Sequence, residues 1–239
     1  MNGSLHDEYL AAMGVQRWVV RDAGATHSVP EDEPETAVAP LPAVPQAAVA
    51  AAPDWTLLAA QVSACTRCEL HKTRTRAVFG AGNRQADWMI IGEAPGADED
   101  REGEPFVGRA GRLLNAMLFA AGYQRDEVYI ANIIKCRPPN NRDPSSEQAA
   151  CCRGYLERQI ELVSPRLILA VGRIAAHNLL HTEAPLGRMR GKVHRYGEQG
   201  IATVVTYHPA YLLRSPLEKR KVWEDLLFAQ AACSSQTTA

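Results

Sequence analysis

Short apolar runs alternate with helical patterns along residues 55–239. The apolar runs are bounded by turn-forming residues and have the length of buried strands. They cover residues 88–91, 128–134, 167–171 and 202–207. The helical patterns lie near residues 55–64, 108–121, 145–163, 172–180 and 216–232. This alternation predicts an α/β fold, in which a largely parallel sheet is covered by helices on both faces.

The two ends of the chain show other patterns. Residues 1–22 combine a short helical pattern, a glycine and an apolar tail with Trp18, which is typical of a docking peptide; packing on its own domain is the alternative. Residues 23–54 are rich in Ala, Pro and acidic side chains, which predicts a disordered linker. Residues 233–239 form a polar tail, also predicted to be disordered, with Cys233 as a free thiol. The folded domain is therefore expected to span residues 55–232.

The composition limits the classes of protein that fit. No apolar run approaches the roughly 20 residues of a membrane span, and the first residues lack the pattern of a secretory signal. We therefore expect a cytosolic protein with no membrane association. Residues 1–54 hold eight acidic side chains against two arginines, whereas the rest of the chain is moderately basic. A basic domain suits a polyanionic ligand, although ordinary surface charge gives the same balance.

Four cysteines have the layout of a metal framework. Cys65 and Cys68 form a C-x-x-C pair, and Cys136 and Cys152 follow far downstream. In the cytosol thiols stay reduced, so spaced cysteines indicate a metal more often than a disulfide. The fold must bring the second pair to the first.

Polar residues follow three of the predicted strands. The turn at residues 92–96 reads Gly-Glu-Ala-Pro-Gly and lacks the Gly-Lys-Ser/Thr ending of a phosphate-binding P-loop. Phe106, between glycines and a proline, is either a platform for a planar base or a plug in the core. Asn132 stands in an otherwise apolar strand and offers a donor and an acceptor. His208 follows the last strand, where it either donates to developing charge or has a structural role.

The combined motifs resemble the family 4 uracil-DNA glycosylases, from about residue 64 to residue 229. The resemblance rests on the turn at 92–96, on Asn132 with Cys-Arg-Pro at 136–138, and on His-Pro-Ala-Tyr-Leu-Leu-Arg at 208–214. It implies a three-layer αβα sandwich around a four-stranded parallel sheet. It also implies a [4Fe–4S] cluster on Cys65, Cys68, Cys136 and Cys152, with Cys151 as a bystander; a structural zinc ion is the alternative.

The resemblance further implies a uracil-DNA glycosylase that flips uracil out of DNA and hydrolyses its N-glycosidic bond. Phe106 would stack on the base, Asn132 would read its polar edge, and His208 would stabilise the departing anion. Backbone groups of the turn would complete the site, with Glu99 positioning water and Glu93 holding the turn. The residues of that turn expected at the substrate are Gly92, Ala94 and Gly96.

Several side chains would contact DNA if the resemblance holds. Leu212 and Leu213 are the candidates for a wedge that fills the gap left by the flipped base. The candidates for phosphate contacts are Arg190, Lys192 and Arg214. His194 lies where a related group carries a histidine that becomes linked to DNA, but the residues around it differ, so we expect ordinary turnover by a monomer.

Other functions stay open at this point. They are a uracil-DNA binding protein that does not turn over or that traps DNA covalently, and an electron carrier. Residues 9–21 also resemble, weakly, the segment with which the clamp-loader psi subunit binds its chi partner.

Overall fold

The computed structural model describes residues 55–234. The sequence-based expectations for a docking peptide at 1–22 and a linker at 23–54 lie outside these residues, as does most of the expected tail. At the boundary of that tail the structure differs from the prediction. The last helix, α9 (Lys219–Ser234), runs two residues past the predicted end, and Cys233 is buried in the core that α9 forms with the sheet.

A six-stranded sheet forms the centre of the molecule, in the order β1-β3-β2-β4-β6-β5. The four central strands are parallel and correspond to the four predicted runs. They are β2 (Trp88–Gly92), β3 (Tyr129–Asn132), β4 (Leu167–Val171) and β6 (Ile201–Thr206). Two short edge strands, β1 (Ala81–Gly82) and β5 (His194–Tyr196), add antiparallel pairs that the sequence pattern did not predict.

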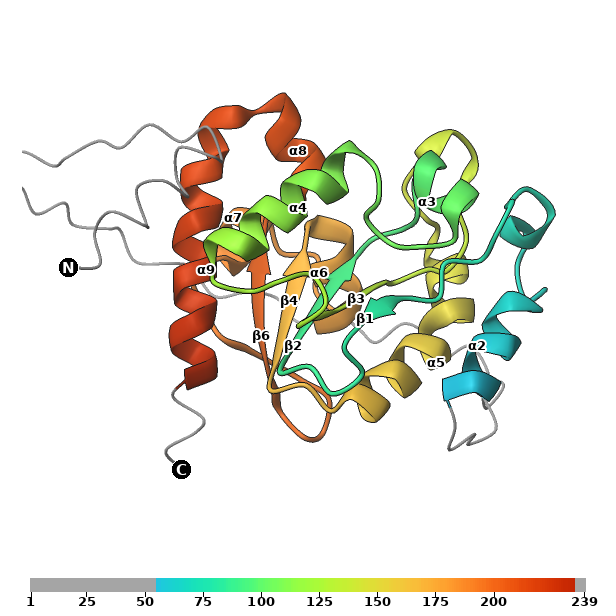
Figure 1. The fold of residues 1–239 in the computed structure, drawn as a ribbon, viewed down its shortest axis with the longest axis horizontal. Helices are drawn as coiled ribbons and strands as arrows, with labels where there is room; N and C mark the ends of the chain where they lie inside the picture. The colour runs from blue at the N-terminus through green and yellow to red at the C-terminus, as the bar shows by residue number, and fades with distance from the viewer. Residues whose placement is uncertain (1–54, 235–239) are drawn as a thin grey trace, which may run out of the picture.

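Helices cover both faces of the sheet, as the resemblance implies. On one face Met89, Ile168 and their neighbours pack against α5 (Ser146–Val163) and α6 (Arg173–Leu180). On the other face the alternate strand residues, such as Ile90 and Leu169, pack against α4 (Arg109–Ala120) and α9. The period of two along each strand sends neighbouring side chains to opposite layers. The result is a three-layer αβα sandwich (Figure 1).

The remaining helices extend these layers. α2 (Trp55–Ser63) packs on α5 through Leu58 and Val62, and lies at the opposite end of the molecule from α9 (Figure 1). Shorter helices occupy the connections: η1 (Glu69–Lys72), α3 (Ala97–Glu102), η2 (Pro139–Asn141), α7 (Leu186–Met189), α8 (Pro209–Arg214) and η3 (Pro216–Glu218). Within residues 55–234, no helix is both long and apolar enough to cross a membrane.

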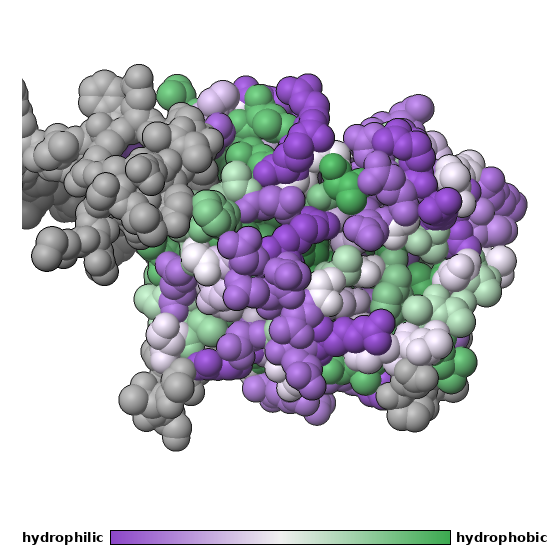
Figure 2. All heavy atoms as spheres, viewed as in Figure 1, coloured by the Kyte–Doolittle hydropathy of each residue, from purple (hydrophilic) through white to green (hydrophobic). Residues whose placement is uncertain are grey.

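Ligands of parallel α/β sheets bind outside the carboxyl ends of the strands. The loops at these ends run into α3 and α8, and Figure 2 shows hydrophilic side chains gathered over α3 and a mixture of hydrophilic and hydrophobic ones over α8. Each of the polar motifs predicted from the sequence begins at this edge of the sheet.

Candidate active site

The loop after β2 is held by one carboxylate. Glu99, in the first turn of α3, accepts hydrogen bonds from the backbone N–H of Gly96 (3.0 Å), Val107 (2.9 Å) and Gly108 (3.0 Å). These three bonds tie the turn at 92–96 to the segment that carries Phe106. Glu99 therefore acts on the shape of the loop, the role predicted for Glu93, rather than presenting both oxygens to water.

Glu93 is the carboxylate whose environment is unusual. Burial raises the pKa of Glu93 to about 7, and nearby Asp143 raises it further while Arg173 opposes the shift. The group therefore titrates near neutral pH, where a carboxyl group of this kind can exchange protons. The structure shows that Glu99 holds the loop, and the predicted roles of the two glutamates toward water and the turn stay predictions.

Phe106 is a core residue, one of the two roles that the sequence left open, and its predicted role as a platform for a base stays a prediction. Its side chain is buried in the layer of α4 and α9, as a core residue would be. Its ring also lies 5.6 Å from the ring of His208, at an interplanar angle of 31°. Only glycine fits beside it at position 92, because a Cβ there would lie 2.6 Å from Phe106 Cζ and 2.5 Å from Asn132 Oδ1. These four residues, Gly92, Phe106, Asn132 and His208, are called the base site below.

Asn132 stands at the last position of β3, paired with Gly92 of β2. The side chain is 2% exposed, and its Oδ1 atom has no hydrogen-bond partner among the described residues. A buried polar atom without a partner costs roughly 1–3 kcal/mol. Such a cost at the carboxyl edge of the sheet is typical of a group that a ligand satisfies.

His208 is held as a neutral donor. Its Nδ1 accepts the backbone N–H of Ala210 (3.1 Å), so the proton of the neutral ring resides on Nε2. Burial and the charge of Arg214 lower the pKa of His208 to about 4, against the smaller opposing effect of Glu99. At neutral pH the ring therefore offers an Nε2–H group without carrying a charge.

The predicted DNA contacts separate into exposed and buried side chains. Leu213 is 39% exposed whereas Leu212 is fully buried, so only Leu213 is available as a wedge. Arg214 and Lys192 are exposed, as expected of phosphate contacts. Arg190 is not: it donates to Asp225 (2.7 Å) and to the Lys221 carbonyl.

Arg190 therefore has a structural role in the fold, and its predicted phosphate contact stays a prediction. Its guanidinium stacks over the ring of Tyr207, and Asp225 also accepts a hydrogen bond from Thr206. The cluster anchors the end of β6, directly before His208. Sequence spacing could not show this because Asp225 lies 35 residues away, on α9.

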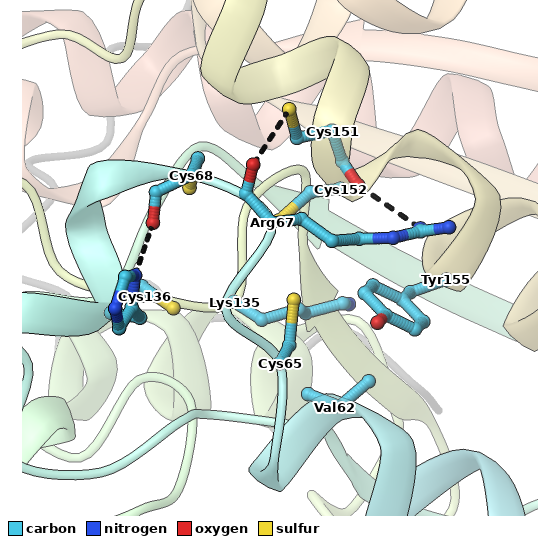
Figure 3. A pocket seen from close by; sticks show the side chains of 10 residues that line it. Val62, Cys65, Arg67, Cys68, Lys135, Cys136, Cys151, Cys152 and Tyr155 are labelled. Carbon is cyan, nitrogen blue, oxygen red and sulfur yellow. Dashed lines mark hydrogen bonds between the residues drawn. The ribbon is translucent and has the colours of Figure 1, made fainter. Parts of the chain in front are cut away.

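Four cysteine sulfurs turn toward one space between α2, α5 and the loop after β3 (Figure 3). They belong to Cys65, Cys68, Cys136 and Cys152, and are called the cysteine site. Cys151 lines the same pocket, but its sulfur points away, toward the carbonyl oxygen of Arg67 at 3.5 Å. No three His, Cys, Asp or Glu side chains within residues 55–234 meet the geometry of a single-ion site.

One sulfur of the cysteine site accepts a hydrogen bond from the protein: the Arg74 guanidinium donates to Cys136 Sγ (3.0 Å). The Tyr155 hydroxyl and the backbone N–H groups of Leu70 and Lys135 lie near the sulfurs of Cys65, Cys68 and Cys152. Cys151 instead donates its own proton. Acceptance of such bonds suits thiolate ligands, whereas donation suits a thiol. Burial raises the pKa of Cys152 to about 12, so that thiol stays protonated in the absence of a bound cation.

Lys135 joins the cysteine site to the base site, and sequence reasoning missed it. The side chain is fully buried, and its Nζ atom donates to the Asn132 carbonyl (3.0 Å) and to Gln159 Oε1 (2.6 Å). The signal in the sequence is a lysine inside an apolar run, three residues after Asn132 and next to Cys136. Only the fold shows that its partner is Gln159 of α5.

Comparison with known proteins gives one consistent result. The sequence profile of the Uracil DNA glycosylase superfamily matches residues 79–227. A type-4 uracil-DNA glycosylase of Archaeoglobus fulgidus is 47% identical over 163 residues, which are 65% of this chain and 81% of that protein. The type-4 enzyme of Sulfurisphaera tokodaii is 43% identical over 69% of this chain and 78% of that protein. The type-4 enzyme of Thermotoga maritima is 41% identical over 71% of this chain and 90% of that protein.

Proposed function

The chain belongs to the uracil-DNA glycosylase superfamily, and we propose that it removes uracil from DNA by hydrolysing the N-glycosidic bond. The observation that carries this proposal is the unpartnered Oδ1 of Asn132, buried beside Phe106 and His208. An amide at this position can accept the N3–H of uracil and donate to its O4 atom. Cytosine presents the opposite pattern on this edge, which supports selection for uracil.

The charges of the reaction match the groups of the base site. Cleavage leaves negative charge on the departing uracil and positive charge on the sugar. The neutral His208 ring carries its proton on Nε2. It can therefore donate a hydrogen bond to the departing uracil anion without any change in its own protonation state. The Glu93 carboxylate, once ionised, would either position the attacking water or stabilise the positive charge that develops on the sugar. DNA must present the base outside the helix, and the exposed Leu213 fits the role of the side chain that fills the gap.

Release of free uracil from a uracil-containing oligonucleotide tests the proposal. The full chain should release uracil, and His208→Ala should slow single-turnover release by roughly 10²–10³-fold, since one lost donor costs about 3–4 kcal/mol. His194→Ala is the matched control, because His194 bonds to the Met189 carbonyl in a separate part of the fold. It should retain near-normal release.

Other outcomes of the same assay favour the alternatives. Tight binding of the oligonucleotide without release indicates a binding protein. An adduct that survives denaturation and disappears in His194→Ala indicates a covalent trap. Either result overturns the proposed turnover.

We also propose that the cysteine site holds a [4Fe–4S] cluster. A donor set made only of cysteines supports it, as does the hydrogen bond from Arg74 to Cys136 Sγ, since such bonds tune the electron density of a cluster. When bound, the cluster would act as a structural group that joins α2, α5 and the loop after β3. Iron and sulfide analysis with absorbance near about 400 nm tests this. One equivalent of zinc without iron would replace the cluster with the zinc alternative.

The remaining expectations concern partners. We propose that the protein acts as a monomer on DNA in the bacterial cytosol, and that residues 9–21 bind the chi subunit of the clamp loader. A pull-down with purified chi tests the second point. Trp18→Ala should lose chi, and equal retention by that variant and the parent chain contradicts the assignment.

A further inference from the structure

Phe106 has a backbone conformation that its residue type disfavours. Its φ angle is +54°, in the left-handed region, where a side chain meets the following carbonyl oxygen. Residues held in this way persist only where the surrounding structure fixes them, and they gather at functional sites. The ring of Phe106 lies beside Gly92 and His208. The orientation of the ring therefore depends on the contacts that fix the Phe106 backbone.

Arg125 supplies that fixation. Its guanidinium donates to the carbonyl oxygens of Pro105 (2.5 Å) and Phe106 (3.3 Å). The same group donates to Asn115 Oδ1 of α4 (2.9 Å), which sets the direction of the fork. Arg125 lies in the loop between α4 and β3, about twenty residues after the carbonyls that it holds. The two terminal nitrogens of its planar guanidinium can donate to two neighbouring carbonyls in a fixed geometry. A lysine ammonium is a single point donor and would hold the two carbonyls less rigidly.

The opposite side of the same backbone is closed by α4. A Cβ at Gly111 would lie 1.7 Å from the Phe106 carbonyl oxygen, so the helix packs directly on this peptide. The Phe106 carbonyl is thus caught between the backbone of α4 and the guanidinium of Arg125. Rotation of the peptide would break the bonds to Arg125 and move the ring relative to Asn132 and His208.

We propose that Arg125 is a positioning residue for base recognition: it holds the strained Phe106 backbone so that the ring stays stacked against the uracil. This inference rests on the proposed function and deepens it. Arg125 does not touch the base in this account. It acts through Phe106, which distinguishes it from a residue that merely joins α4 to the preceding loop.

A double-mutant cycle separates these two roles. Arg125→Met should reduce kcat/KM for uracil release by roughly tenfold, the scale of one lost stacking contact. In a Phe106→Leu background, which already lacks the aromatic face, Arg125→Met should cost less than about twofold. Arg125→Lys should recover part of the loss, because one ammonium can still reach a carbonyl. Arg195→Met, which removes a surface arginine bonded to the Gly200 carbonyl, should leave kcat/KM unchanged.

The results that contradict the inference are distinct from failure of the function. Wild-type protein that releases no uracil would contradict the glycosylase proposal itself. Equal losses from Arg125→Met in both backgrounds, or no loss in the wild-type background, would overturn the positioning role. If Arg125→Met does not fold, Asn115→Ala replaces it, since it removes only the bond that orients the guanidinium. A few-fold loss that vanishes in Phe106→Leu is then expected, and an unchanged or background-independent value contradicts the proposal.

Discussion

The base site and the cysteine site differ in how their polar atoms are satisfied. In the cysteine site the sulfurs lie near donor groups of the protein, and Cys136 Sγ accepts a hydrogen bond from Arg74 (3.0 Å). In the base site Asn132 Oδ1 has no partner in the described part of the chain, although Asn132 is as deeply buried as Cys136 and Cys152. Unsatisfied groups destabilise the fold unless a ligand completes them, whereas satisfied groups help to hold it.

The difference fits the two proposals, a base that binds transiently at one site and a cluster that stays bound at the other. A base that enters and leaves must find its donors and acceptors free each time. A cluster that stays bound needs its ligands oriented and protected from exchange. Lys135 connects the two sites, since its N–H faces Cys152 and its Nζ atom holds the Asn132 carbonyl. A cluster bound as proposed would therefore also help to hold the backbone of Asn132.

The largest effect is expected from a change in the cysteine site. Cys152→Ser should abolish iron binding and leave the protein poorly folded, because a hydroxyl replaces an inward-facing sulfur. Cys151→Ser is the matched control on the neighbouring residue, whose sulfur faces the Arg67 carbonyl. It should keep the parent iron content and melting temperature. Iron analysis and thermal unfolding of the purified proteins decide the matter, and equal iron loss in both variants would contradict the assignment of ligands.

A change in the base site should separate stability from activity. Asn132→Leu replaces an unsatisfied amide by an apolar group of similar size. We expect stability within about 1 kcal/mol of the parent, or above it, because a buried polar atom without a partner is removed. Uracil release should nevertheless fall by at least roughly 10²-fold, as the edge of the base loses its partner. A large drop in melting temperature would show that Asn132 is a structural residue instead.

The smallest effect concerns the titration of Glu93. The folded state raises the pKa of Glu93 to about 7, from the ordinary value of 4.5. The folded protein therefore holds a proton that the unfolded chain has released, and the stability that this gives is lost as pH rises through about 7. Glu93→Gln stays neutral at every pH. The melting temperature of this variant minus that of the parent should therefore increase from about pH 5 to about pH 8. A constant difference over that range would exclude the shifted pKa.

The fold was predictable because the sequence contains clear apolar runs and helical periodicities. The four apolar runs became the parallel strands, and the five predicted helices formed within a few residues of their expected bounds. Two-residue β1 and three-residue β5 could not be predicted, since strands this short have no pattern of their own and exist only as partners of β3 and β6. The short helices α3 and α8 likewise follow from their loops, not from apolar periodicity.

The sequence by itself determined the kinds of group at the two sites. The cysteine spacing, the glycine turn, Asn132 and His208 are local motifs, and they remain recognisable without coordinates. The tertiary structure alone decided which charged groups serve those motifs. Arg190 pairs with Asp225, Glu99 binds three amides, and Arg125 holds Phe106, all through contacts between separate segments. A long polar side chain can reach many partners, so its role depends on which segments the fold brings within hydrogen-bond distance.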